Sequence, residues 1–147
     1  FFLLESDLLY EDRALTALRE FDQKNMVLAS GKTYGGDEVY IDVDDRGSLL
    51  SLTKDLAAAD SAFGEFVGIS KVSIEAYQKM CDIFSREGPL TIDYEYVMPN
   101  VAHPDNFIVH RIDDLVWCEI DDSNQLTRAS SEVIFALDAA NDLHSRN

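Results

Sequence analysis

Short runs of apolar residues predict the buried strands of this chain. Residues 1–4 and 26–29 contain no charged side chain, which is typical of strands buried on both faces of a parallel or mixed sheet. Apolar and polar residues instead alternate over 39–44, and a turn sequence at 45–47 leads into a second apolar run at 49–52. This alternation predicts a β-hairpin. Further strands are expected at 66–69, 107–109 and 115–117.

Apolar residues spaced by three and four positions predict three helices. The first is expected over 8–21, the second begins after Ser73, a good N-cap, and the third covers 133–143. Strands that alternate with helices, together with one hairpin, predict an α/β fold built on a mixed sheet.

The first apolar run also bears on domain organisation. Parallel neighbours of a buried strand come from βα units, and none precedes residues 1–4. We therefore expect residues 1–147 to be one domain that is incomplete at its N-terminal side. The strand at residues 1–4 should therefore have one unpaired edge. This edge is exposed to solvent, or it is covered by the missing N-terminal segment or by another chain, since exposed apolar edges promote association.

Composition and charge narrow the classes of partner. The 147 residues include 28 Asp and Glu against 12 Lys and Arg, a net charge of −16, which argues against nucleic acid. No apolar run approaches the roughly 20 residues that span a bilayer, so no membrane contact is expected. Two cysteines without CxxC spacing, Cys81 and Cys118, are interpreted as reduced, buried thiols of a cytoplasmic protein.

Several familiar motifs do not fit this sequence. Residues 31–33 (GKT) resemble the end of a P-loop, but Met26 stands where that motif requires glycine. A calcium loop starting at Asp42 fails because its fifth and twelfth positions are Arg46 and Thr53. The three histidines form no HExxH pair, and neither a GxSxG elbow nor a dinucleotide fingerprint occurs.

Two predicted strands end directly in carboxylates. Residues 1–4 lead into Glu-Ser-Asp at 5–7, and residues 115–118 lead into Glu-Ile-Asp-Asp at 119–122. In open α/β sheets, ligands bind beyond the carboxyl ends of strands, so these acids can meet there. Gathered carboxylates repel one another, and a hard divalent cation such as Mg²⁺ relieves that repulsion.

Helix capping is the alternative interpretation of the same acids. Aspartate is a favoured N-cap residue, so Asp7 and Asp122 could each begin the helix expected after it. Capping is the commoner role for an aspartate that follows a strand. Spacing alone therefore leaves both interpretations open.

Four segments in matching order resemble one enzyme family. They are residues 3–10 (LLESDLLY), 52–56 (LTKDL), 64–71 (GEFVGISK) and 117–121 (WCEID). Over almost its whole length the chain is similar to the latter part of bacterial cytidylyltransferases acting on phosphocholine or 2-aminoethylphosphonate. These enzymes belong to the larger group of sugar-phosphate nucleotidyltransferases.

The resemblance implies a fold and a reaction. It implies a Rossmann-like, GT-A-like nucleotidyltransferase domain with a mainly parallel mixed sheet, flanking helices and a hairpin. In the family, Mg²⁺ assists attack of a substrate phosphate or phosphonate oxygen on the α-phosphorus of CTP or another NTP, and pyrophosphate leaves. The family's N-terminal half, with its glycine-rich loop and basic residues, has no counterpart here. The isolated chain is therefore expected to be inactive.

The resemblance also assigns site residues. Asp7 matches the family's first metal-binding aspartate, and Glu119 with Asp121 match the acids of the second strand end; Asp7 and Asp121 would be the catalytic pair. Lys54 falls where relatives approach the phosphoryl group of the acceptor. Glu65 falls where they approach its alcohol or amine end.

The acceptor itself stays open. A trimethylammonium group prefers aromatic faces, whereas a primary amine prefers directed hydrogen-bond acceptors. One candidate binding group is Tyr34 with Asp37 and Glu38, and the other is Tyr94 with Glu95 and Tyr96. The sequence does not choose among phosphocholine, aminoethylphosphonate and a sugar 1-phosphate. A truncated, non-catalytic domain that binds a small charged ligand or a partner is a further alternative.

Overall fold

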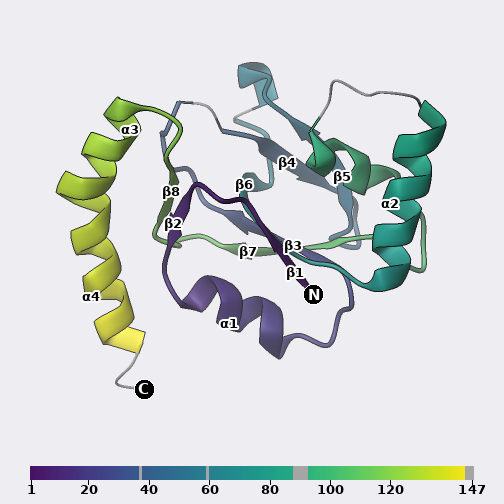
Figure 1. The fold of residues 1–147 in the computed structure, drawn as a ribbon, viewed down its shortest axis with the longest axis horizontal. Coiled ribbons are helices and arrows are strands. Elements are labelled where there is room, and N and C mark those ends of the chain that lie inside the picture. Colours follow the sequence, from purple (N-terminus) through teal and green to yellow (C-terminus); the bar gives the residue numbers. More distant parts are fainter. Residues whose placement is uncertain (37, 59, 88–92, 145–147) are drawn as a thin grey trace.

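A six-stranded mixed sheet and a separate two-stranded sheet form the centre of the molecule (Figure 1). The computed structural model describes residues 1–36, 38–58, 60–87 and 93–144. The main sheet has the order β5-β4-β6-β3-β7, and β1 lies beside β6. Its strands are β1 (Phe2–Leu4), β3 (Met26–Ser30), β4 (Tyr40–Val43), β5 (Leu49–Thr53), β6 (Gly64–Lys71) and β7 (Ile108–Ile112). The small sheet consists of β2 (Leu8–Tyr10) and β8 (Trp117–Glu119).

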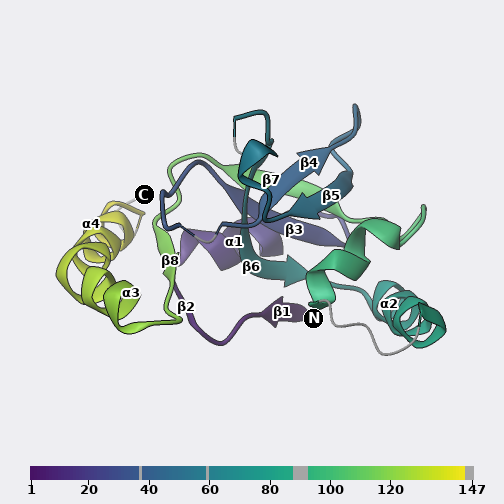
Figure 2. The same ribbon diagram turned by 90° about the horizontal axis from the view of Figure 1, so that it is seen from above.

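Helices flank this framework. They are α1 (Arg13–Glu20), α2 (Ile74–Glu87), α3 (Ser123–Arg128) and α4 (Ile134–His144). Short 3-10 helices occur at η1 (Leu56–Ala58) and η2 (Tyr94–Asn100), and a π-helical segment, η3 (Ala129–Val133), joins α3 to α4. Seen from above, α3 and α4 lie at the end formed by β2 and β8, and α2 lies at the opposite end (Figure 2).

The strand pairings correct one expectation. The α/β fold, the mixed sheet and the β4–β5 hairpin are confirmed. The expectation of a mainly parallel sheet is wrong for the described pairs, since only β3 and β7 are parallel. The reason is the placement of β6, the longest strand, which runs antiparallel to β1, β3 and β4.

Strand β3 shows why its sequence is apolar throughout. Val27 and Ala29 pack into the core beneath α2 and η2, while Met26 and Leu28 pack into the core beneath α1. Successive side chains of a strand point to opposite faces, and both faces are covered here. The prediction that residues 26–29 form a buried strand is therefore confirmed.

The opening segment differs from its expected form. β1 pairs with β6 through one edge, and Phe2 and Leu4 are exposed rather than buried on both faces. Leu8 was expected in the first helix, but it belongs to β2, and α1 begins only at Arg13. The helical spacing of Leu8 is a coincidence, because its backbone pairs with Glu119 of β8.

Two smaller expectations have mixed outcomes. Both cysteines are free thiols; Cys118 is buried as expected, whereas Cys81 on α2 is exposed. The Ser73 cap is confirmed, because its hydroxyl accepts a hydrogen bond of 3.1 Å from the Ala76 backbone N–H.

Among the helices in the described parts of the chain, none is long and apolar enough to cross a membrane.

Candidate functional site

The small sheet brings the two acidic strand ends together. In the antiparallel ladder between β2 and β8, Leu8 pairs with Glu119. One step beyond the ladder, the Ile120 backbone N–H donates to the Asp7 carbonyl oxygen at 3.0 Å. Asp7 and Glu119 come from opposite ends of the sequence, and this pairing makes them neighbours.

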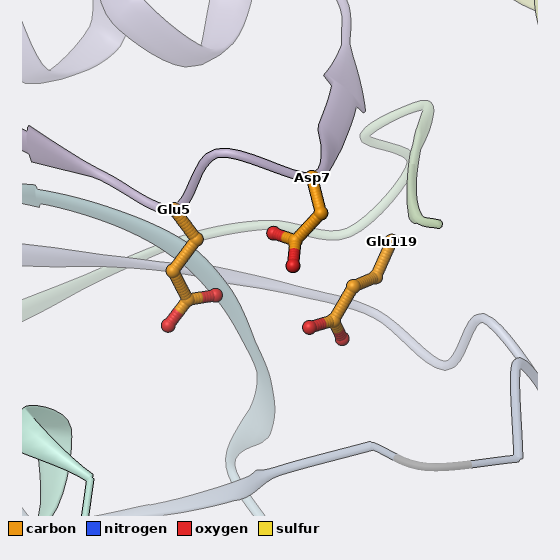
Figure 3. A group of neighbouring side chains, drawn as sticks. All are labelled: Glu5, Asp7 and Glu119. Carbon is orange, nitrogen blue, oxygen red and sulfur yellow. The ribbon is translucent and has the colours of Figure 1, made fainter. Parts of the chain in front are cut away.

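Glu5 completes a group of three carboxylates. Oxygen atoms of Glu5, Asp7 and Glu119 lie within 4.8 Å of one another, and the side chains converge on one point (Figure 3). Glu5 reaches this place because its N–H donates to the Gly68 carbonyl oxygen at 3.0 Å. Gly68 has a φ of +75°, and a Cβ at this position would overlap the Glu5 carboxylate. The glycine therefore provides both the backbone conformation and the space.

Electrostatics favours a cation at this point. Two carboxylate charges no more than 4.8 Å apart repel by about 3 kcal/mol or more at an effective dielectric constant near 20. Burial, followed by the neighbouring Asp7 charge, raises the pKa of Glu5 above its ordinary value. One oxygen of Asp7, Oδ1, is buried and has no hydrogen-bond partner among the described residues. An unsatisfied buried oxygen in an all-oxygen donor set fits a hard divalent ion such as Mg²⁺.

A cavity of about 360 Å³ opens beside this three-carboxylate group. Six carboxylates and two cationic side chains of the described residues line it. The charged lining residues are Glu5, Asp7, Glu38, Asp93, Glu95, Glu119, Lys54 and Arg128. The cavity is therefore strongly acidic, although Lys54 provides a positive charge near Glu5 and Glu95.

Tyr94 connects the cavity wall to the three-carboxylate group. Its hydroxyl donates to Glu5 Oε1 at 3.1 Å, across a large separation in sequence. Burial and the nearby Glu5 charge raise the pKa of Tyr94 above its ordinary value. The hydroxyl therefore stays protonated and keeps the Glu5 carboxylate in position. Lys54 and Tyr94, both predicted from the sequence, lie in the same cavity as Asp7 and Glu119.

Glu65 has a different environment. Its Oε2 accepts hydrogen bonds from Thr33, at 2.8 Å from the backbone N–H and 2.7 Å from the hydroxyl. Arg128 donates to the Thr33 carbonyl oxygen at 3.2 Å. Glu65 is 3% exposed and does not line the cavity beside the three-carboxylate group. Its described contacts hold the loop after β3, and its contact with a substrate stays a prediction.

Three other predicted residues are not part of the three-carboxylate group as the structure describes it. Tyr34 is 84% exposed, with a φ of 58°, and does not line the cavity. Asp37 lies outside the described residues. Asp121 is exposed, follows β8 and is not a member of the three-carboxylate group. Its role as a metal ligand stays a prediction.

The capping alternative holds for one aspartate and not for the other. Asp122 caps α3, because its Oδ1 accepts from the backbone N–H groups of Asn124 and Gln125 at 2.7 and 2.8 Å. Asp7 instead precedes a strand, β2, so it caps no helix. The two aspartates that looked equivalent in the sequence therefore have different roles.

Sequence reasoning did not select one acid of the three-carboxylate group. Glu5 stands in the acidic strand end that was recognised, but Asp7 alone was chosen from it. The available signal was an acid two residues before a selected aspartate. Glu95, which was named with Tyr94 in a candidate acceptor group, lies on η2, lines the cavity and is only 5% exposed.

Glu95 yields a prediction about stability. Burial raises its pKa above the ordinary 4.5, so the folded protein binds a proton more readily than the unfolded chain. The contribution of Glu95 to the unfolding free energy should then fall as pH rises from 4.5 towards neutrality. We expect Glu95→Gln to stabilise the chain at neutral pH by about 1 kcal/mol, the scale of one unsatisfied buried polar group. Urea unfolding without divalent ions measures this change.

The control for this prediction is Glu75→Gln on α2, because Glu75 is exposed. Glu75→Gln should give no gain in unfolding free energy at neutral pH, since the Glu75 charge lies in the first turn of α2, where a negative charge is favourable. Below pH 4.5 the gain from Glu95→Gln should disappear, since the wild-type carboxyl is then protonated in both states. An equal gain at all pH values would contradict a charge-based cost at Glu95.

Comparison with solved structures identifies the fold. The inositol-1-phosphate CTP transferase of T. maritima matches 93% of this chain with a TM-score of 0.67 and 18% identity. A structure assigned as a glucose-1-phosphate thymidylyltransferase from Bacillus anthracis, in complex with a sucrose, matches 96% with a TM-score of 0.62 and 11% identity. The chain has a nucleotidyltransferase fold. No family model matches the sequence.

The match covers only part of each nucleotidyltransferase. The chain spans about half of the solved structures it resembles, 55% of the first and 54% of the second. At these identities the likeness establishes the nucleotidyltransferase fold of residues 1–147 and leaves the reaction and its substrates as proposals.

Proposed function

We propose that this chain is the metal- and acceptor-binding part of a nucleotidyltransferase. The complete protein would transfer a cytidylyl group from CTP, or the equivalent group of another NTP, to a small phosphate or phosphonate. Phosphocholine and 2-aminoethylphosphonate are the proposed acceptors. The observation that supports this function best is the convergence of Glu5, Asp7 and Glu119 in a cavity that Lys54 also lines.

The proposed reaction is an in-line displacement. An acceptor oxygen forms a bond to the α-phosphorus of the NTP, the bond from that phosphorus to the bridging oxygen breaks, and pyrophosphate leaves. When bound, Mg²⁺ would supply positive charge to the phosphoryl oxygens. Asp7 and Glu119, with Glu5, would hold the ion, and Asp121 is proposed as a further ligand.

The other residues of the cavity would position the acceptor. Lys54 would attract its phosphoryl group, since a lysine ammonium is a suitable point charge for an anion. Tyr94 keeps Glu5 in place through its hydrogen bond. Only two cationic side chains of the described residues line the cavity, which is little positive charge for a triphosphate. We propose that a further segment or another chain supplies the remaining cations.

Pyrophosphate release tests this function. The protein as encoded by its gene should release pyrophosphate from CTP only when Mg²⁺ and an acceptor are both present, with phosphocholine, 2-aminoethylphosphonate and glucose 1-phosphate compared. Lys54→Ala should raise the KM for the acceptor about 10-fold, the scale of one charge-assisted hydrogen bond. Lys24→Ala is the control, because Lys24 is exposed and lines a different pocket.

The two parts of this test can fail separately. If no acceptor supports pyrophosphate release at any Mg²⁺ concentration, the proposed function is wrong. If release occurs but the KM is the same in Lys54→Ala and Lys24→Ala, the role of Lys54 is wrong. Preference for glucose 1-phosphate would identify the acceptor as a sugar 1-phosphate.

A further inference from the structure

A second cavity lies at the opposite end of strand β3 from the acidic cavity beside the three-carboxylate group. Its volume is about 480 Å³, within the roughly 300–1,000 Å³ of small-molecule sites. Its lining residues belong to residues 23–25 before β3, 44–48 in the β4–β5 turn and 103–108 leading into β7. Thr33, which follows β3, lines the acidic cavity instead. The two cavities share no described lining residue, so the second cavity is separate from the proposed metal site.

Hydrogen bonds between distant segments hold the wall of the second cavity in place. The Ile108 N–H donates to the Asn25 carbonyl oxygen at 3.1 Å, and the Val109 N–H donates to the Gly47 carbonyl oxygen at 2.9 Å. Asn25 is 3% exposed, and its side-chain amide donates to the Asp105 carbonyl oxygen at 2.9 Å. Because these contacts need no ligand, binding in the second cavity costs little backbone freedom.

Two cationic side chains line the second cavity. They are Lys24 and Arg46, which are both exposed and form no ion pair with another described residue. His103 also lines the cavity, and its imidazole ring provides a further N–H donor. Clefts lined by positive charge concentrate anions. This part of a chain with 28 Asp and Glu is therefore suited to a negatively charged ligand.

Asp44 is the one carboxylate among the described lining residues. Its Oδ1 accepts hydrogen bonds from the backbone N–H groups of Ser48, at 2.8 Å, and Arg46, at 2.9 Å. These hydrogen bonds lower the pKa of Asp44, and they hold its carboxylate against the turn. Asp22 and Asp45 adjoin the two cations or the turn in sequence, but they do not line the cavity. The lysine and arginine charges of the lining therefore outnumber its carboxylate.

The donor groups select the kind of anion. An arginine guanidinium presents paired N–H donors that match two oxygens of a phosphate, and a lysine ammonium is a point charge that suits a third. The side-chain amides of Gln23 and Asn106 also line the cavity, and amides both donate and accept hydrogen bonds. They suit the hydroxyl or carbonyl groups of an organic part attached to the phosphate.

We infer that the second cavity binds a small organic phosphate, with Lys24 and Arg46 holding its phosphoryl group. The organic part would contact the amide side chains, which inorganic phosphate at the two cations would leave without a partner. This inference does not depend on nucleotidyl transfer, because the second cavity shares no described lining residue with the acidic one.

Nuclear magnetic resonance of the isotope-labelled 147-residue chain tests the inference. EDTA is present throughout, so that no metal ion attracts a phosphate to the acidic cavity. Glycerol 3-phosphate should shift the backbone amide signals of Lys24, Arg46 and Ser48, with a Kd of about 1 mM, the scale of a small ligand with few contacts. Inorganic phosphate should bind more weakly. Glycerol, which lacks the phosphate, should shift none of these signals.

Variants show whether the cations are responsible. Arg46→Ala should weaken glycerol 3-phosphate binding about 10-fold, the scale of one hydrogen bond to a charged group, and it keeps the backbone N–H that donates to Asp44. Arg46→Lys should retain part of the affinity, because it keeps the charge and loses the paired donors. Arg19→Ala removes the same charge at an exposed position of α1 outside the cavity, and it should leave the Kd unchanged.

Each other outcome overturns a stated part of the inference. Equal weakening in Arg46→Ala and Arg19→Ala overturns the site, because general attraction by positive charge would then explain the binding. Absence of shifts at about 10-fold above the expected Kd overturns it as well. Tighter binding of citrate than of glycerol 3-phosphate overturns the phosphate in favour of a carboxylate ligand. Inorganic phosphate that binds as tightly as glycerol 3-phosphate overturns the contact with an organic part.

Discussion

Replacing Asp7 with asparagine should lower the affinity of the 147-residue chain for Mn²⁺, a spectroscopic substitute for Mg²⁺, by about 10- to 100-fold or more. Even partners outside the ligand shell cause losses of about this size in metal sites. The physical reason is that Asp7 Oδ1 is buried, has no described hydrogen-bond partner and lies in the three-carboxylate group. Electron paramagnetic resonance of free Mn²⁺ measures the change.

In the complete protein, the same Asp7→Asn variant should reduce pyrophosphate release from CTP by about 10²- to 10³-fold, the range for losing one charge-stabilising contact in a transition state. Asp22→Asn, at an exposed position after α1, is the control and should change neither measurement. Unchanged Mn²⁺ affinity in Asp7→Asn would remove the metal assignment.

Asp121→Asn tests the part of the metal prediction that came only from the resemblance. If Asp121 joins the ligands when the ion binds, its loss should resemble that of Asp7. If Glu5, Asp7 and Glu119 suffice, Asp121→Asn should bind Mn²⁺ normally and Glu5→Gln should not. The comparison therefore decides whether Asp121 is a ligand in addition to Glu5, Asp7 and Glu119.

Gly68→Ala should damage stability and metal binding together. A residue with a side chain is strained at φ +75°, at a cost of about 1–2 kcal/mol. The added Cβ would also overlap the Glu5 carboxylate and force it out of the three-carboxylate group. We expect a loss in unfolding free energy of about 2 kcal/mol or more, measured with urea, and a Mn²⁺ affinity at least 10-fold weaker, as for other disturbed ligand shells.

Gly47→Ala provides a matched control. Gly47 has nearly the same backbone angle, with a φ of +77°, but a Cβ there would meet nothing within 4 Å. Gly47→Ala should therefore lose about 1–2 kcal/mol of stability and keep its Mn²⁺ affinity. If both variants lost Mn²⁺ affinity equally, the effect would come from general destabilisation and not from displacement of Glu5.

Local features of the sequence predicted several elements correctly. The alternation of residues 39–44 indicated the β4–β5 hairpin, and Ser73 indicated the start of α2. Both signals lie within a few residues of the structure they specify, because turn geometry and capping are local interactions. The uninterrupted apolar run at 26–29 likewise required two covered faces, and β3 has them.

The candidate site was only partly predictable. The acids at 5–7 and 119–122 marked two strand ends that meet in the structure, and Asp7, Glu119 and Asp121 were chosen from them. Of these three, Asp7 and Glu119 belong to the three-carboxylate group and Asp121 does not. Choosing Glu5 required knowing that Gly68 leaves space beside it, which depends on how β1 meets β6. Glu95 was named with Tyr94 in a candidate acceptor group, but its burial could not be predicted, because it depends on η2 closing one side of the cavity.

The sequence alone specified the apolar strands, the hairpin, the capped helix α2 and the acidic strand ends, because each depends on neighbours along the chain. The tertiary structure decided that residues 8–10 form a strand, that β6 runs antiparallel to three partners and that Glu5, Asp7 and Glu119 converge. These features depend on pairing between segments far apart in sequence. Such pairing is selected by the burial and hydrogen bonding of the whole fold, and no short window of residues contains that information.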